Sequence, residues 1–369
     1  RRLLGFYLAS AQAAHRLAYE GSILVDRLSA PAVPGRTFAS ADEAVAWLAA
    51  EGEDMFAAIG QAVGGSWDGP PPLATAADLL VAMEPLLETG TYAHEFDRRA
   101  RAVLAAAREA GDASSELRCR YVLARVRFGA NRLDEAEQEF RRALDLTEAT
   151  GDSVLAGEIL NGLGVVAGRK RRHREALSWF DAALQVYRDT GVPAGEALVL
   201  SYSARDHLGL GDAEAAIAAA ERGLAIFTEI GSGAGMARAR YHLGIVLSRV
   251  GRFTEAVVHH AECLEFFRAS RQRVWEQRVC YRLAETFVAA GRHSEAARHA
   301  EQALAVSREI AHPYGEAQAL AVLGKALGGL GGTRRSAECL RAAHEIFRRL
   351  GAPEADDLRP LLERDGVGS

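Results

Sequence analysis

Apolar positions recur every 40 residues from residue 73 onward, without an insertion or a deletion. Leu163-Gly164 is matched 80 residues later by Leu243-Gly244 and again by Leu323-Gly324, and the units between them carry Leu or Ser followed by Ala. Each unit holds two stretches of roughly 15 residues with helical spacing of apolar side chains. The pattern predicts a helix A, a turn and a helix B in every unit. A repeat of this length is typical of a solenoid.

Small residues mark where the two helices of a unit are expected to pack. Twelve residues after the small residue of helix A comes an Ala of helix B, as in the pair Gly164 and Ala176. A bulky side chain at such a place would push the pair apart, so we expect the closest approach of the two helices there. The Ala recurs at Ala136, Ala176, Ala216, Ala256 and Ala296.

Glycines divide the repeats. Gly is favoured at helix ends that require a left-handed backbone. Most units have a Gly at the middle turn and another at the end: Gly90, Gly211, Gly251, Gly291 and Gly331 in the middle, and Gly111, Gly151, Gly191, Gly231 and Gly351 at the end. The array is therefore predicted to fill residues 73–352 with seven units, of which the first is a degenerate cap. A polar tail follows at 353–369.

Residues 1–72 do not follow the repeat and are predicted to form a helical linker region. Leu3–Tyr19 has the spacing of an amphipathic helix. A loop rich in Pro and Gly follows at 29–37, and Ser40 with Glu43 three residues later is a capping-box pattern that predicts the start of a second helix. That helix should end near Gly64, before the Pro run at 70–72.

Composition limits the possible functions. The formal net charge is −5, which argues against direct nucleic-acid binding by this segment. No apolar run is long enough to cross a membrane, and no signal peptide opens the chain. The four cysteines are scattered, as in a cytoplasmic protein with reduced thiols. The chain begins with Arg1 rather than Met, which suggests a piece of a longer protein.

The Leu-Gly pair, the turn Gly and the Ala twelve residues later resemble the tetratricopeptide repeat in its longer variant. This resemblance implies an all-α, right-handed solenoid of antiparallel helix pairs, with helix A lining the concave face. It says little about function, because the fold serves many partners.

A second resemblance lies before the array. Phe38–Val63, which contains Ala44-Val45-Ala46-Trp47-Leu48-Ala49-Ala50-Glu51, is similar to the segment that joins an ATPase module to its repeats in AfsR-type regulators of antibiotic pathways. Arg1–Tyr19 resembles the end of that ATPase region. The resemblance implies a sensor portion of a transcription activator that controls an upstream ATPase and DNA-binding module. The alternatives are a free-standing adaptor that binds peptides or proteins, and self-assembly through the repeat ends.

The residues provide no motif for catalysis or for a cofactor. Gly324-Lys325 lacks the glycine spacing and the hydroxyl of a phosphate-binding loop. His259, His260, His293 and His299 have no Cys or carboxylate at ligand spacing, so no metal site is predicted. A nucleophile elbow is absent as well. We therefore expect a binding protein without cofactors rather than an enzyme.

A basic run, Arg169–Arg174, falls at a middle turn. It is either a solvated turn or an electrostatic contact with an acidic partner.

The strongest functional signal is a stripe on helix A. The second, fifth and ninth positions of the motif share one face, and Arg-x-x-Tyr recurs there in three units. Arg grips carboxylates or phosphates with paired hydrogen bonds, and Tyr offers a flat apolar face, so we expect an acidic peptide, a small anionic effector or the upstream module to bind. Alternatively, Tyr packs between A helices while Arg pairs with Glu158 or Glu285. The predicted residues are Arg118, Tyr121, Arg125, Asn161, Arg205, Arg238, Tyr241, Arg278 and Tyr281.

Overall fold

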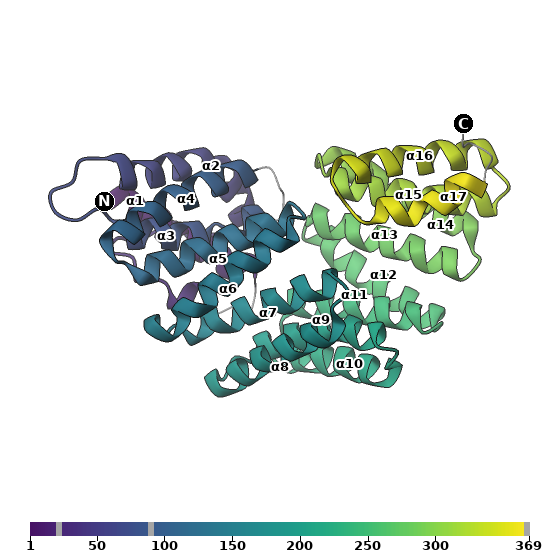
Figure 1. Cartoon of the computed structure of the whole chain (residues 1–369), viewed down its shortest axis with the longest axis horizontal. Coiled ribbons are helices and arrows are strands. Elements are labelled where there is room, and N and C mark those ends of the chain that lie inside the picture. Colours follow the sequence, from purple (N-terminus) through teal and green to yellow (C-terminus); the bar gives the residue numbers. More distant parts are fainter. Residues whose placement is uncertain (20–23, 88–91, 365–369) are drawn as a thin grey trace. The chain divides into compact units, whose positions relative to one another are not determined.

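The computed structural model describes residues 1–19, 24–87 and 92–364, and every regular element in them is a helix. The chain divides into two compact units, Arg1–Gly235 and Met236–Ser369, which are described separately. The predicted all-α fold of antiparallel helix pairs is confirmed, and consecutive helices pair along the chain (Figure 1).

The first unit begins with helices that precede the repeats. They are α1 (Arg2–Ala18), the 3-10 turn η1 (Leu24–Arg27) and α2 (Ala41–Gly64). The predicted start of α2 is confirmed, since the Ser40 hydroxyl accepts a hydrogen bond from the Glu43 N–H at 3.2 Å. The Glu43 carboxylate accepts in return from the N–H of Ala39, at 2.9 Å. These paired bonds satisfy backbone donors that the helix itself leaves free.

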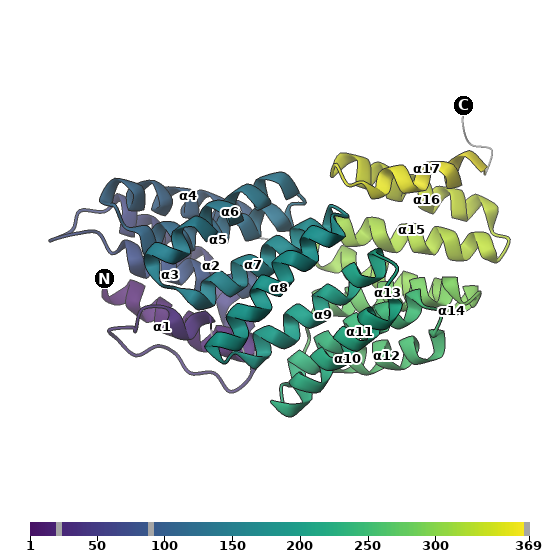
Figure 2. The same cartoon turned by 60° about the horizontal axis from the view of Figure 1, so that its bottom comes forward.

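The repeats of the first unit follow as α3 (Leu73–Ala82), the turn η2 (Glu84–Leu87), α4 (Ala93–Ala110), α5 (Ala113–Gly129), α6 (Leu133–Thr150), α7 (Ser153–Arg169), α8 (His173–Thr190), α9 (Pro193–Gly209) and α10 (Ala213–Glu229). Helices α1 and α2 pack on α3 (Figure 2). One buried cluster contains Leu8, Leu48 and Leu79. The linker region and the first repeats therefore share a single hydrophobic core.

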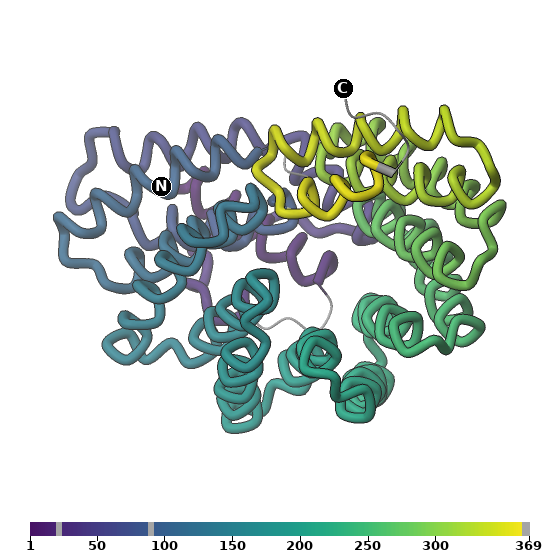
Figure 3. The backbone as a smooth tube through the Cα atoms, turned by 45° about the vertical axis from the view of Figure 1, so that its right-hand side comes forward, coloured from purple at the N-terminus to yellow at the C-terminus, as the bar shows by residue number. Residues whose placement is uncertain are grey.

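The second unit continues the pattern with α11 (Gly233–Arg249), whose first turn contains the boundary, α12 (Phe253–Ala269), α13 (Arg273–Ala289), α14 (His293–Glu309), α15 (Pro313–Gly329), α16 (Thr333–Arg349) and α17 (Glu354–Arg364). The tube in Figure 3 follows these helices in green to yellow. In the segment predicted as a polar tail, α17 packs on α16 and buries Ala355 and Leu358 with Leu340 and Phe347. The end of the array is thereby covered by an amphipathic helix.

Left-handed residues close the helices at one place in each turn. The predicted turn glycines all have positive φ there, for example Gly211 at 85° and Gly151 at 67°, whereas Gly90 lies outside the described residues. Where the repeat lacks Gly, the same conformation is adopted by Asn131, Arg171, Arg271 and Ala311, with φ between 50° and 59°. The register of the repeat thus imposes the backbone conformation even on residues that disfavour it.

Contact between helix A and helix B depends on the residue that faces the small position. Ala176 is fully buried as expected, but the space above Gly164 is filled by Phe180, and a Cβ on Gly164 would lie 2.5 Å from its ring. The same relation holds 80 residues later, where a Cβ on Gly244 would lie 2.5 Å from His260. Repeats with Ala on helix A, at Ala204 and Ala284, have the smaller Ala220 and Ala300 on helix B. A larger side chain on one helix is thus balanced by a smaller one on the other. Ala124 with Phe140 departs from this exchange.

We expect the Gly164→Leu substitution to destabilise the protein by about 1–3 kcal/mol, because the new side chain must displace the buried Phe180 ring. Urea unfolding followed by circular dichroism would measure this. Gly129→Leu is the control, since that glycine is likewise on a helix A but is exposed at its last residue and has nothing within 4 Å of its Cβ position. Equal unfolding midpoints for the two variants would refute this packing assignment.

The buried His260 should make stability depend on pH. Burial, assisted by the charge of Arg282, lowers the pKa of His260 to about 3. The unfolded chain takes up this proton at its ordinary pKa of about 6.5, so stability is complete above that pH and is lost as the pH falls toward 3. We expect His260→Phe, which reproduces the pair of Gly164 and Phe180, to remove about 2 kcal/mol of the stability change between pH 7 and pH 5. Parallel pH profiles for variant and wild type would contradict this.

Candidate binding surface

The predicted stripe lies on the A helices of both units. Neighbouring A helices touch directly, as α7 does with α9 and α13 with α15. Three predicted residues lie on α5, one each on α7 and α9, and two each on α11 and α13. In that order they are Arg118, Tyr121 and Arg125; Asn161; Arg205; Arg238 and Tyr241; and Arg278 and Tyr281.

The α5 group is engaged by neighbouring helices. Arg118 forms an ion pair with the buried Asp78 of α3 at 2.5 Å. Arg125 pairs with Glu84 at 2.5 Å and also donates to the Tyr121 hydroxyl at 3.3 Å. Tyr121 is 1% exposed, and burial together with the Glu84 charge raises its pKa well above 10. These side chains therefore stabilise the core, although a third of the Arg125 side chain stays exposed.

Glu84 is a partner that the sequence reasoning missed. It occupies the position where the other repeats have Gly or Ala, and from the sequence this difference indicated only that the first repeat is degenerate. In the structure it is 6% exposed and carries the charge that holds Arg125. The departure from the repeat was the available signal.

The middle of the stripe is less basic. Asn161 is 7% exposed, and its Oδ1 has no hydrogen-bond partner among the described residues. One turn earlier on α7, Glu158 accepts a hydrogen bond from the Tyr187 hydroxyl at 2.8 Å. Arg205 is half-buried on α9, beside Asp206, which binds His173 at 2.8 Å. Burial raises the pKa of Asp206.

An aromatic and charged group links α11 with α13 in the second unit. Tyr241 is 7% exposed, meets the Trp275 ring edge-on at 5.5 Å, and accepts a hydrogen bond from Arg282 Nε at 3.3 Å. Arg282 also pairs with Glu285 at 2.5 Å, while the Tyr281 hydroxyl donates to the same carboxylate at 2.8 Å. The sequence reasoning missed Arg282, although its spacing of three from Glu285 suggests an ion pair on one helix face.

Arg278 differs from Arg118 and Arg125, which are both held in ion pairs. Its guanidinium lies 4.9 Å above the Trp275 ring, and no carboxylate of the described residues forms an ion pair with it. The nearest acid along the stripe, Glu285, is already neutralised by Arg282. Helix α11 contains no acidic residue, and its Arg240 pairs with Glu262 of α12 at 2.6 Å. The A-helix face of the second unit consequently keeps a positive charge that can attract an anionic group.

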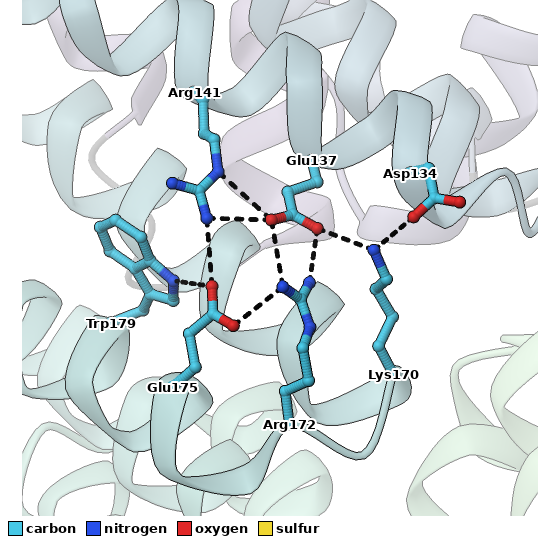
Figure 4. Close-up of polar contacts among 7 residues, drawn as sticks. All are labelled: Asp134, Glu137, Arg141, Lys170, Arg172, Glu175 and Trp179. Carbon is cyan, nitrogen blue, oxygen red and sulfur yellow. Dashed lines mark hydrogen bonds and ion pairs between the residues drawn. The ribbon is translucent and has the colours of Figure 1, made fainter.

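Several residues of the basic run Arg169–Arg174 form ion pairs or hydrogen bonds within the protein. Figure 4 shows Lys170 and Arg172 converging on Glu137 of the preceding repeat, at 2.9 and 2.5 Å. Arg141 joins Glu137 to Glu175 at 2.9 and 3.1 Å. Arg169 donates to Asn131 at 2.8 Å. These contacts connect two neighbouring repeats, so the run is more than a solvated turn, and its Lys170 and Arg172 are already paired within the protein.

Ion pairing in this joint between repeats stabilises the charged form of the Glu137 carboxylate. Burial alone would raise the pKa of Glu137, but hydrogen bonds from Arg172, Lys170 and Arg141 outweigh it and lower the pKa to about 2. Trp179 closes the side of the network, since its Nε1 donates to Glu175 at 3.3 Å and its ring lies under Arg141 at 5.3 Å (Figure 4). Positive and negative groups balance here, which leaves little free charge for an acidic partner.

Two further properties bear on the candidate chemistry. Within residues 1–19, 24–87 and 92–364, no group of three His, Cys, Asp or Glu side chains is placed to hold a metal ion. No helix in that same part of the chain is both long enough and apolar enough to cross a membrane.

Sequence comparison finds relatives along the whole chain. It is 36% identical over 367 residues to the regulatory protein AfsR of Streptomyces griseus, and 38% identical over 363 residues to AfsR of Streptomyces coelicolor. These alignments cover 100% and 98% of the chain. The chain spans only 36% of the length of each relative.

Solved structures share the fold at low identity. A Rap protein complexed with competence and sporulation factor matches with a TM-score of 0.64 and 12% identity, over 99% of this chain and 98% of that one. A signal transduction ATPase with numerous domains (STAND) that has a tetratricopeptide repeat sensor, from Pyrococcus horikoshii, matches with a TM-score of 0.52 and 12% identity, over 97% and 62%.

A family model supplies the assignment. The tetratricopeptide-repeat model matches four overlapping stretches, 120–189, 155–229, 195–269 and 235–309, which together cover more than half of the 369 residues. The matched stretches begin within α5 and end with α14, so they contain the helix pairs that carry most of the candidate surface. The chain belongs to the tetratricopeptide-repeat family.

Proposed function

We propose that this chain is the signal-receiving region of a bacterial transcription regulator of the AfsR type, located in the cytoplasm. The observation that carries the proposal is the likeness to two AfsR proteins over 98–100% of the chain. The fold shared with the repeat sensor of a STAND ATPase supports it. The array would control an ATPase and DNA-binding module in the remaining part of the regulator.

Control of this kind requires two states that the array distinguishes. An effector or partner changes the activity of the module only if it binds the two states with different affinity. Direct contact of A-helix layers between repeats gives a path by which binding at one repeat alters the packing of the next. The array would then hold the module inactive until a ligand shifts that balance.

The chemistry of the ligand follows from the charge of the second unit. Arg278 offers a guanidinium that has no carboxylate partner among the described residues and is fixed over Trp275. Arg binds planar carboxylates and phosphates with paired hydrogen bonds, and an aromatic base restricts its motion beforehand. An acidic peptide segment, supplied by the upstream module or by another protein, satisfies this site.

The proposal predicts that the intact gene product contains a nucleotide-binding module whose ATP hydrolysis responds to this region. The full-length regulator and the same protein lacking residues 73–352 would be compared in a steady-state ATPase assay. We expect the rates to differ at least threefold. Identical rates, or an intact gene without such a module, would sink the proposal and favour the free-standing adaptor.

Arg278→Ala is expected to weaken binding of a fluorescein-labelled hexaglutamate peptide about tenfold, because the paired hydrogen bonds to a carboxylate are lost. Fluorescence anisotropy at low ionic strength would measure the affinity. Arg334→Ala is the control, since that side chain is 92% exposed on α16 and pairs with Glu338. If both variants lose affinity equally, binding is diffuse and Arg278 is not its anchor.

A further inference from the structure

Residues 24–29, which include η1, lie against the repeats although they belong to the linker region. Leu24 and Val25 are 4% and 1% exposed, and η1 contacts α7. Both side chains belong to the same buried cluster as Leu155 and Ile159 of that helix. Asp26 and Arg27, in contrast, are exposed, and Asp26 pairs with Arg16 of α1 at 2.8 Å. Two adjacent aliphatic side chains therefore anchor the segment.

The backbone of the segment is held by side chains from three different helices. The Ser29 N–H donates to Asp78 of α3 at 2.8 Å, and Gln12 of α1 donates to the Ser29 carbonyl at 3.2 Å. Arg118 of α5 donates to the Arg27 carbonyl at 3.5 Å. Asp78 and Gln12 are 1% and 4% exposed, so two buried polar groups are directed at the main chain of this short segment.

This combination of contacts is also found where proteins bind linear peptides. Hydrogen bonds to main-chain groups give affinity for any sequence, and pockets for a few side chains give selectivity. Segment 24–29 shows both features, since Gln12 and Asp78 form hydrogen bonds with its main chain and the side chains of Leu24 and Val25 are buried. Arg118 would keep its ion pairs with Asp78 and Asp152 if the segment left, so departure strands no buried cation.

We propose that the surface formed by α5 and α7, together with Gln12 and Asp78, is a peptide-binding surface occupied here by the chain's own segment 24–29. Its external partner is a linear peptide with two adjacent aliphatic residues, which competes with that segment. This proposal does not depend on the regulatory function proposed above, because it rests only on contacts within the first unit.

The test uses a fluorescein-labelled peptide with the sequence of residues 24–29 and the whole chain as receptor. Val25→Asp places a carboxylate in the apolar anchor site and should release the segment. We expect the peptide to bind this variant at least tenfold more tightly than the wild type. Asp26→Ala is the matched control, because Asp26 is half-exposed and pairs with Arg16 away from α7, and it should bind the peptide as the wild type does.

Equal affinity for Val25→Asp, Asp26→Ala and wild type, with unchanged helical content by circular dichroism, would overturn the proposal. Hydrogen exchange on the wild type keeps the test decisive if Val25→Asp fails to fold. The Ser29 amide should exchange faster than the amide of Tyr121 in α5, and still faster with excess peptide. Exchange as slow as that of Tyr121, with and without peptide, would mark segment 24–29 as a permanent part of the core.

Discussion

Packing of helix A on helix B across a small residue is the contact on which each repeat depends. Close-packed interiors tolerate little change of volume, so a glycine on one helix must be matched by a large side chain on the other. Gly164 beneath Phe180 and Gly244 beneath His260 obey this exchange, and Gly324 lies beneath Leu340 in the same way. This contact explains the constant spacing of 16 residues between the paired positions, because a residue inserted in the turn between them would move the small position away from the side chain that fills it. The turns follow the same register, and even Arg171 adopts the left-handed backbone conformation that its turn position requires.

Charge is arranged around this packing mostly by internal pairing. A helices are rich in Arg, and many of these reach carboxylates on the B helices or on neighbouring repeats, as Arg120 does with Glu139 and Arg240 with Glu262. The joint around Glu137 is the largest case, and its low pKa shows how strongly three cations hold that carboxylate. Arg278 combines two properties, since it has no ion pair with a carboxylate of the described residues and its guanidinium lies over an aromatic ring. Arg278 over Trp275 thereby becomes the better anchor for an anionic group than Arg118 or Arg125, which are already paired.

The two units consequently present different surfaces on their A helices. In the first unit the chain's own segment 24–29 covers part of α7, and the polar groups there are directed at its main chain. In the second unit the aromatic group of Tyr241 and Trp275 supports positive charge instead. Under the functions proposed above, the two surfaces would serve different ligands, one a peptide that displaces segment 24–29 and the other an acidic segment. Reciprocal coupling between the two would follow if each favours a different state of the array.

The sequence by itself determined the helix pairs, their register and the turn positions, because these follow from local spacing of apolar residues and glycines. It also indicated the capped start of α2 and the helix before it. It could not say which Arg of the stripe is paired, since the partners Asp78 and Glu84 come from helices outside the stripe. Only the tertiary structure decided that Phe180 covers Gly164, that Arg282 rather than Arg278 binds Tyr241, and that residues 24–29 lie on α7. Such contacts depend on the direction of side chains between elements distant in sequence, which periodicity along one helix does not specify.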